Sequence, residues 1–337
     1  MKPSFVIGIA TYKRPDDLAR CLKSLVPMIK VRSNFRLVVV NDASHDENYQ
    51  KVISQYTDCI EYVIRAENGG PGLARNTAFA GAKEDFLVCT DDDCIPPENW
   101  LDVLQSVVET NPEVDLIAGN VKPVWTGDPS WFERLIAAPI AYPRPHFIDG
   151  SLLTAVTANS AMRREIFERV GGFNSDLRGA TEDHNITQTI IQAGGSYLAP
   201  EHWMMGHRAE DSLKNMRKRF HWYGKGCAQS VLKEDSWKLA EVSSDGTIWG
   251  CTKMVLKKTA LAWKNPENRS KGFVKRVAFT LVNCMCGFEY ERGWRQGLKE
   301  ISKTWPADLP GEPTLDERYT DFGDSVLQVQ ASGKTVS

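Results

Sequence analysis

The sequence predicts an α/β domain with a mostly parallel sheet and helices on both of its faces, followed by a helical C-terminal region. Short apolar or β-branched runs alternate with segments of helical spacing through the first hundred residues. A mixed pattern of strands and helices continues to about residue 210, and only helical segments follow it. Such alternation is typical of parallel sheets, which bind ligands at the carboxyl ends of their strands.

Four strands are expected in the first half of the domain, each a short apolar or β-branched run. They are residues 5–11, 36–42, 60–66 and 85–91. Helical spacing begins behind Pro15 with Leu18, Cys21, Leu22 and Leu25. Further helices are expected at residues 47–56, 73–83 and 98–109. The loops after the four strands should therefore share one crevice. These loops are residues 11–15, 42–46, 67–72 and 91–97.

The pattern after residue 110 is mixed, and it predicts where the domain ends. Strands are expected at residues 114–121, 154–162 and 197–199, and helices at 164–170 and 182–193, each helix followed by a Gly pair. Residues 1–210 are thus predicted to form one domain. Beyond it, helices at 212–233, 250–263, 272–286 and 290–303 make residues 211–305 a helical region. Residues 306–337, with three prolines and an acidic balance, should be a loosely ordered tail.

The composition is that of an ordinary globular protein. Of 337 residues, 42% are hydrophobic and 25% charged, which excludes fibrous and wholly disordered classes. A net charge of -2 lacks the positive field of a general nucleic-acid binder, so no nucleic-acid partner is expected. The eight cysteines are scattered, as in a reducing compartment. No export signal is visible and the longest weakly apolar run, residues 277–288, is shorter than the roughly 20 residues of a membrane span, so a cytoplasmic protein is expected.

Three consecutive carboxylates, Asp91, Asp92 and Asp93, end the fourth strand. They would repel one another at neutral pH unless they are solvated or share a cation. The loop after the first strand reads IGIATYKRP and offers no glycine-rich cradle, so a cation or basic side chains would have to meet the charge of a diphosphate. Mg²⁺ or Mn²⁺ suits carboxylate ligands. A solvated acidic turn is the alternative interpretation.

Five stretches in sequence order resemble the family 2 glycosyltransferases, which have a GT-A fold. They are VIGIATYKRPDDLARCLKSL (6–25), LVVVNDASHD (37–46), ENGGPGLARNTA (67–78), FLVCTDDDCIPPENWL (86–101) and ANSAMRREIFERVGGFNSDLRGATEDHNITQTIIQAGG (158–195). The resemblance implies a GT-A-type sheet with a nucleotide-binding half at residues 1–110 and an acceptor half at residues 111–210. It also implies a metal-dependent inverting transferase that moves a sugar from a nucleotide diphosphate donor, UDP-linked, to a saccharide or glycolipid hydroxyl.

The same resemblance implies a set of residues that contact the donor. They are Thr11, Tyr12, Arg14, Asp42, Arg75, Asp92 and Asn159. Asp42 would accept a hydrogen bond from the uracil imide, and Arg75 would help to hold the nucleotide. Without the resemblance, Asp42 could equally cap a helix and Arg75 could be a surface helix residue.

Metal ligands are implied at Asp91, Asp93 and His207, with Asp93 favoured as the direct ligand. A lone histidine is more often structural, and the nearby His202 is a competing candidate. The implied ion is Mn²⁺ or Mg²⁺.

Glu182 and Asp183 open a predicted helix, as the paired acids of the family do. The resemblance implies that Asp183 is the general base that deprotonates the acceptor hydroxyl, with Glu182 beside it. The helix dipole alone is the alternative explanation, because it favours acids in a first turn.

The expected C-terminal helices combine basic and aromatic side chains. The set begins with Lys214, Arg217, Lys218, Arg219 and Lys225, interleaved with Phe220, Trp222 and Tyr223. Such a surface can lie on an anionic membrane, which would suit a lipid-linked acceptor and a peripheral position on the inner face. A solvated basic face, or a platform packed on the catalytic domain, is the alternative.

Two rival functions stay open on sequence alone. A sugar-phosphate nucleotidylyltransferase shares the architecture and the cation requirement, but it needs a Gly-rich basic loop directly after the first strand, where this chain has TYKRP. A catalytically silent carbohydrate-binding relative is the other, and the intact Asp93 and Asp183 argue against it.

Overall fold

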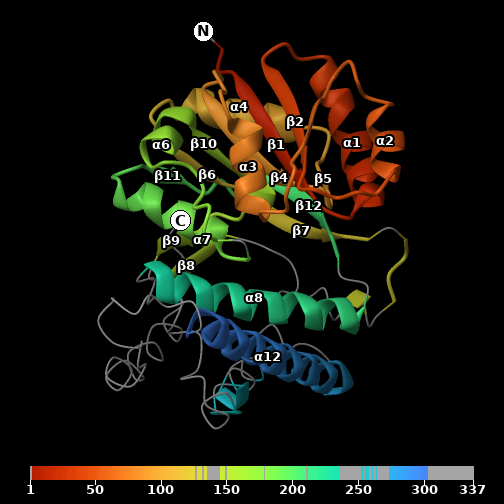
Figure 1. The fold of residues 1–337 in the computed structure, drawn as a ribbon, viewed down its shortest axis with the longest axis vertical. Helices are drawn as coiled ribbons and strands as arrows, with labels where there is room; N and C mark the ends of the chain where they lie inside the picture. Colours follow the sequence, from red (N-terminus) through yellow and green to blue (C-terminus); the bar gives the residue numbers. More distant parts are fainter. Residues whose placement is uncertain are drawn as a thin grey trace. The chain divides into compact units, whose positions relative to one another are not determined.

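The computed structural model describes most of the chain as two compact units, Met1–Asp211 and Ser212–Ser337, and each is treated by itself (Figure 1). The described residues are 2–125, 127–130, 133–134, 145–148, 150–177, 179–209, 212–234, 252–253, 255–257, 260, 263 and 273–302. The tail expected over residues 306–337 lies outside them.

The first unit is built on a seven-stranded sheet with the order β11-β6-β10-β4-β1-β2-β3. Its strands are β1 (Phe5–Thr11), β2 (Phe35–Asn41), β3 (Glu61–Ile64), β4 (Phe86–Asp91), β6 (Leu116–Ala118), β10 (Ser160–Arg163) and β11 (Tyr197–Leu198). All neighbouring pairs are parallel except those of β10, which runs antiparallel to both β4 and β6. The expected α/β fold with a mostly parallel sheet is confirmed.

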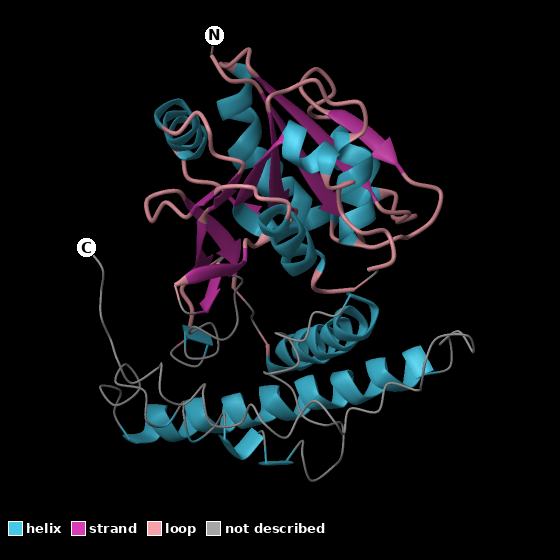
Figure 2. Ribbon diagram, turned by 90° about the vertical axis from the view of Figure 1, so that its left-hand side faces the viewer, coloured by secondary structure: helices cyan, strands magenta, loops and turns pink. Residues whose placement is uncertain are grey.

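Helices cover both faces of this sheet, as Figure 2 shows. They are α1 (Pro15–Lys30), α2 (Asn48–Ile53), α3 (Pro71–Phe79), α4 (Trp100–Thr110), α6 (Arg164–Arg169) and α7 (Glu182–Gln192). Side chains alternate along β1, so that Phe5, Ile7 and Ile9 join the core beneath α1 and α4. Val6 joins the second core, beneath α3, α6 and α7. Gly8 permits the close approach of α3, because a Cβ there would lie 2.7 Å from the Phe79 ring.

A second sheet brings the end of the unit back to the end of β4. It consists of β5 (Cys94–Ile95), β12 (Met204–Arg208) and β7 (Asn120–Val124), in the order β5-β12-β7. His207 pairs with Cys94 across the antiparallel β5–β12 ladder, one residue past Asp93. A short hairpin, β8 (His146–Ile148) with β9 (Ser151–Thr154), completes the described strands.

The single strand expected at residues 154–162 is interrupted. The chain leaves β9, makes a 3₁₀ turn at Thr157–Asn159, and only then enters β10. The turn allows the Asn159 amide to reach the backbone carbonyls of Asn120 and Trp203, which a continuous strand would not permit.

The second unit contains two long helices, α8 (Leu213–Glu234) and α12 (Phe273–Ser302). Two helices, at residues 272–286 and 290–303, were expected where α12 runs unbroken through Gly287. Gly287 packs against Val255. Backbone contact joins α8 to α12: a Cβ on Gly224 or on Gly293 would lie 1.9 Å from a carbonyl oxygen of the opposite helix. None of the described helices combines the length and apolarity that crossing a membrane requires.

Candidate active site

The candidate site lies where β1, β2 and β4 end. Thr11, Asn41 and Asp91 are the last residues of these strands, and their loops meet as parallel topology requires. Two loop residues just past these ends, Lys13 and Ala43, have positive φ angles of 56° and 61°. Non-glycine residues in this region are uncommon and often mark functional sites.

Asp91, Asp93 and His207 form the candidate metal cluster. One ligand atom from each residue lies within 4.8 Å of the other two. His207 Nδ1 is 2.9 Å from the backbone carbonyl of Arg208, an arrangement that places the proton on Nδ1 and leaves Nε2 with its lone pair. Nε2 lies 3.1 Å from Asp93 Oδ1. Two acceptor atoms at this distance fit a shared cation, and carboxylate oxygens with one imidazole suit Mn²⁺ or Mg²⁺.

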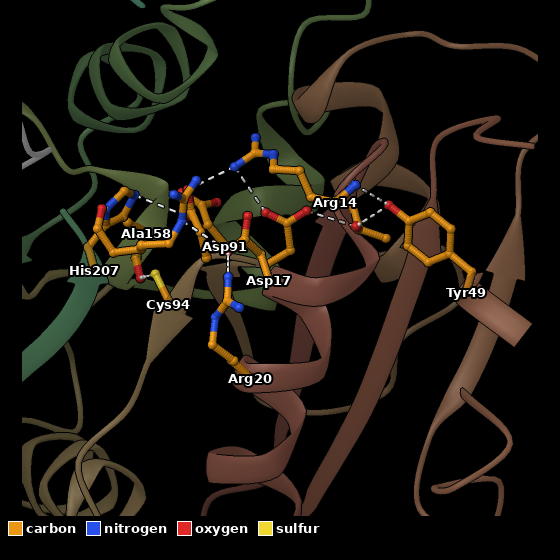
Figure 3. A network of polar contacts seen from close by, with 12 residues as sticks. Arg14, Asp17, Arg20, Tyr49, Asp91, Cys94, Ala158 and His207 are labelled. Atoms are coloured by element: carbon orange, nitrogen blue, oxygen red, sulfur yellow. Dashed lines mark hydrogen bonds and ion pairs between the residues drawn. The ribbon is translucent and has the colours of Figure 1, made fainter. Parts of the chain in front are cut away.

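Arg14 supplies positive charge beside this cluster (Figure 3). Its Nη1 lies 2.8 Å from Asp93 Oδ2 and 3.2 Å from Asp92 Oδ1. The acidic neighbours raise the pKa of Arg14 above its ordinary value, led by Asp92. The Arg14 side chain remains 47% exposed, so its guanidinium can also meet an anion that enters from solvent.

Asp92 is buried and anchors the first loop. Asp92 is 1% exposed, and its Oδ2 accepts a hydrogen bond of 2.7 Å from Thr11 Oγ1. Thr11 in turn accepts from the Tyr49 hydroxyl at 2.8 Å, and Tyr49 accepts from the Arg14 backbone N–H at 2.9 Å. Burial raises the pKa of Asp92, while the charge of Arg14 opposes this rise. Sequence reasoning missed Tyr49, because a tyrosine in an amphipathic helix is indistinguishable from a core residue.

Arg75 joins the metal cluster to the paired acids of α7. The residue is 2% exposed, its Nη1 donates to Glu182 Oε1 at 2.8 Å, and its Nη2 donates to Asp91 Oδ1 at 2.5 Å. Both terminal nitrogens of Arg75 thus bind carboxylates inside the protein, and its contact with the nucleotide stays a prediction. Arg75 therefore positions two acidic residues from distant parts of the chain.

Glu182 and Asp183 begin α7, directly after a strained residue. Thr181 has a φ of 93°, which is a genuine outlier for a β-branched side chain. The buried Glu182 faces Arg75, while Asp183 is half-buried and accepts a hydrogen bond of 2.7 Å from the His184 backbone N–H. Burial raises the pKa of Asp183 to about 7, and the neighbouring Glu182 adds to the rise. A carboxylate with this pKa is matched to proton abstraction near neutral pH.

Asp42 holds the loop that leads into α3. Its carboxylate accepts from the backbone N–H groups of Gly69 and Gly70 and from Arg65 Nη1. The carboxylate is thereby fixed directly after the end of β2. Tyr12, in the first loop, is 39% exposed, and Lys13 Nζ lies 4.9 Å from the centre of its ring.

Asn159 is hydrogen-bonded within the core. It is fully buried, its Nδ2 donates to the carbonyls of Asn120 and Trp203, and its Oδ1 accepts from Trp100 Nε1 at 2.9 Å. These bonds give Asn159 a structural role, and its contact with the donor stays a prediction. The competing histidine, His202, is exposed and is not part of the metal cluster among the described residues.

Comparison with known proteins gives consistent matches. Residues 6–171 match the model of the family described as glycosyl transferase family 2. The chain is 26% identical over 230 residues to glycosyltransferase AglE of Haloferax volcanii, across 67% of this chain and 74% of that protein.

Two solved structures share the fold of this chain. The mannosyltransferase PcManGT from Pyrobaculum calidifontis, in complex with GDP-Man and Mn²⁺, has a TM-score of 0.57 and 16% identity over 87% of this chain and 88% of that one. Staphylococcus aureus TarS 1-349 with UDP-GlcNAc has a TM-score of 0.50 and 15% identity over 87% and 92%. At these identities the structures establish the fold alone.

Proposed function

Because this chain belongs to glycosyl transferase family 2, we propose that it is a metal-dependent inverting transferase that moves a sugar from a nucleotide diphosphate donor to a saccharide or glycolipid hydroxyl. One observation carries the proposal. The candidate metal ligand Asp91 connects through Arg75 to Glu182, which opens α7 beside Asp183, so that cation and base would act at the same site. This connection also argues against the nucleotidylyltransferase and the silent relative.

Asp91, Asp93 and His207 would hold the divalent ion, which when bound neutralises charge on the diphosphate leaving group. Arg14 would bind the same diphosphate through its exposed guanidinium, because no glycine-rich loop is present to do so. Asp92 and Thr11 keep this loop in position beneath it.

Asp183 would take the proton of the acceptor hydroxyl. Its raised pKa makes it a stronger base than an ordinary carboxylate, and Glu182 is itself held by Arg75 and so oriented away from that task. Attack by the activated hydroxyl on the face opposite the leaving diphosphate would occur in one displacement, which inverts the anomeric configuration.

The proposed donor is UDP-linked. A solved neighbour binds UDP-GlcNAc, although another binds GDP-Man, so the choice is the first matter to test. Asp42, fixed by the Gly69 and Gly70 amides, is the residue proposed to accept from the uracil imide. Tyr12 begins the loop after β1, is 39% exposed, and is proposed to line the nucleoside.

A cytoplasmic position with peripheral contact to the inner face of the membrane is part of the proposal. The support is α8, which contains six Lys and Arg residues but only one acidic residue. Its Trp222 is 41% exposed. Basic side chains with an exposed tryptophan favour an anionic lipid surface.

Calorimetry with UDP and GDP, each with Mn²⁺ and in EDTA, tests the function. We expect binding that needs the cation and is lost in Asp93→Ala and weakened in His207→Ala. His202→Ala and Asp58→Ala, both exposed and remote from the cluster, serve as matched controls that bind normally. Equal binding of UDP in EDTA would overturn the metal dependence. A panel of nucleotide sugars, assayed for transfer or slow hydrolysis, would then identify the sugar.

A further inference from the structure

A groove between α8 and α12 in the second unit is lined by basic side chains. It has a volume of about 300 Å³. Its lining residues are Lys214, Arg217, Lys218 and His221 from α8, with Glu289 and Arg292 from α12. We refer to these six residues as the basic groove.

Helix geometry explains why these side chains share one face. The four residues from α8 are spaced i, i+3, i+4 and i+7, which is one side of a helix. The contact between the Gly224 and Gly293 backbones fixes the distance between the two helices, because no side chain separates them there. The groove is therefore a defined feature of the helix pair, since its two walls are held by backbone contact.

The charge of the groove is strongly positive. Its one acid, Glu289, accepts a hydrogen bond of 2.7 Å from Arg217 Nε, and its carboxylate lies 3.5 Å from Arg292 Nη1. Glu289 therefore orients both guanidinium groups. Among the residues that the structure describes, no carboxylate pairs with Lys214 or Lys218. Both arginine side chains are more than half exposed, at 52% and 72%, and can reach a ligand.

The adjoining cavity offers a contrast. It has a volume of about 560 Å³, and its lining includes two acids, Glu289 and Glu291, together with Arg292, Arg295 and Lys299. Its charges are mixed, whereas the basic groove gathers four Lys and Arg side chains around one acid. A volume of about 300 Å³ lies at the small end of ligand sites. It suits a phosphate or diphosphate group but not an entire sugar nucleotide.

We propose that the basic groove binds a phosphate or diphosphate group. The two guanidinium groups offer forked donors that match phosphate oxygens, and the two lysines add point charges. Trp222 is exposed one turn beyond Lys218, where an aromatic side chain would meet the headgroup layer of a membrane. The phosphate could belong to a lipid headgroup or to a free ligand, and both share the same recognition chemistry. This proposal does not depend on the proposed transferase activity.

The test compares two triple variants of the full chain that lose the same charge. The groove variant is Lys214→Gln, Lys218→Gln and Arg292→Gln. The control variant is Lys253→Gln, Lys257→Gln and Lys275→Gln, three exposed lysines of the same unit that lie outside the groove lining. Inorganic pyrophosphate is the first probe, measured by calorimetry in EDTA. We expect the groove variant to lose affinity by at least about tenfold and the control to stay within about twofold of the unmodified chain.

Vesicles distinguish the source of the phosphate. Flotation with phosphatidylglycerol vesicles, with phosphatidylcholine vesicles as the neutral reference, shows a lipid headgroup site if pyrophosphate competes and the groove variant fails to float. Pyrophosphate binding without flotation shows a free phosphate ligand. Equal losses in both triple variants, or no binding of either probe by the unmodified chain, would overturn the proposal. Thermal unfolding checks each variant, and the pair Lys214→Gln and Lys218→Gln, both exposed, replaces the groove triple should that one not fold.

Cation-dependent UDP binding in the same variants keeps the two proposals separate. It should be unchanged in both triples, because Asp93 and its neighbours lie in the first unit. A groove that fails to bind phosphate therefore says nothing against the transferase.

Discussion

Arg75 and Glu182, which are far apart in the sequence, form a buried ion pair with an Nη1 to Oε1 distance of 2.8 Å. The second terminal nitrogen of Arg75 binds Asp91, so one guanidinium serves two carboxylates. Burial raises the pKa of Glu182, and the Arg75 charge opposes that rise. The pair thus keeps a charged group at the start of α7.

Replacement of Arg75 by methionine should destabilise the protein strongly. Loss of one partner leaves a buried carboxylate uncompensated, which typically costs about 3–5 kcal/mol. Urea unfolding measures the change. Arg36→Met is the matched control, because Arg36 also bridges two carboxylates, Glu61 and Glu84, but at the surface. Surface pairs contribute about 0–1 kcal/mol. Equal losses in the two variants would contradict the positioning role of Arg75.

Asp183→Asn should lower the rate of transfer while donor affinity stays close to normal. Removal of a positioned base typically costs about 10²- to 10⁴-fold in rate. The unmodified enzyme should gain activity as pH rises through about 7, because Asp183 must be deprotonated to act. Asp176→Asn, an exposed aspartate just before α7, is the control. Nucleotide binding that falls in parallel with activity would redirect attention to Glu182.

The same pKa shift predicts how stability depends on pH. In the unfolded chain an aspartate titrates near about 4, whereas burial raises the pKa of Asp183 to about 7 in the folded protein. Between these values the folded state holds a proton that the unfolded state releases, so the contribution of Asp183 to stability falls as pH rises. Asp183→Asn removes this contribution. Its melting temperature should match that of the unmodified chain near pH 4 and exceed it at pH 8. Parallel melting curves across this range would contradict the shift.

Asn159→Ala should reduce stability without reducing the activity of the folded fraction. The variant leaves Trp100 Nε1 without its acceptor and takes one donor from each of two backbone carbonyls, and an unpaired buried group costs about 1–3 kcal/mol. Thermal unfolding and donor affinity together decide this. A large loss of donor affinity at full folding would show that Asn159 contacts the donor.

The parallel part of the sheet could be predicted from the sequence, because its strands are continuous apolar runs. Strand β1 lies at the expected residues 5–11, and β4 ends at the expected Asp91. Strand β5 has only two residues, and β12 has the mixed sequence MMGHR. Neither strand shows the alternation of apolar and polar residues by which a strand is recognised. Residue patterns alone therefore gave no reason to place His207 beside Asp93, and only the family resemblance suggested it.

Residue type alone selected the acids at the end of β4 as candidate ligands, and the structure brings Asp91 and Asp93 together with His207. Contacts that depend on three-dimensional partners could not be predicted in this way. Arg75 and Asn159 follow the expected motifs, yet their partners Glu182 and Trp100 lie 107 and 59 residues away. Residue type indicated that these side chains matter, but only the fold shows that Arg75 bridges two acids and that Asn159 is hydrogen-bonded within the core.

The β5–β12 ladder also sets the order in which the site can be completed. Asp91 ends β4 and Asp93 lies two residues later, but His207 reaches them only when β12 pairs with the two-residue strand β5. A growing chain therefore carries the acids long before it carries the histidine. An ion held by all three residues would stabilise the pairing of β12 with β5, since a ligand that binds only the folded state stabilises that state by mass action. Occupancy of the site would then report that the whole unit has assembled.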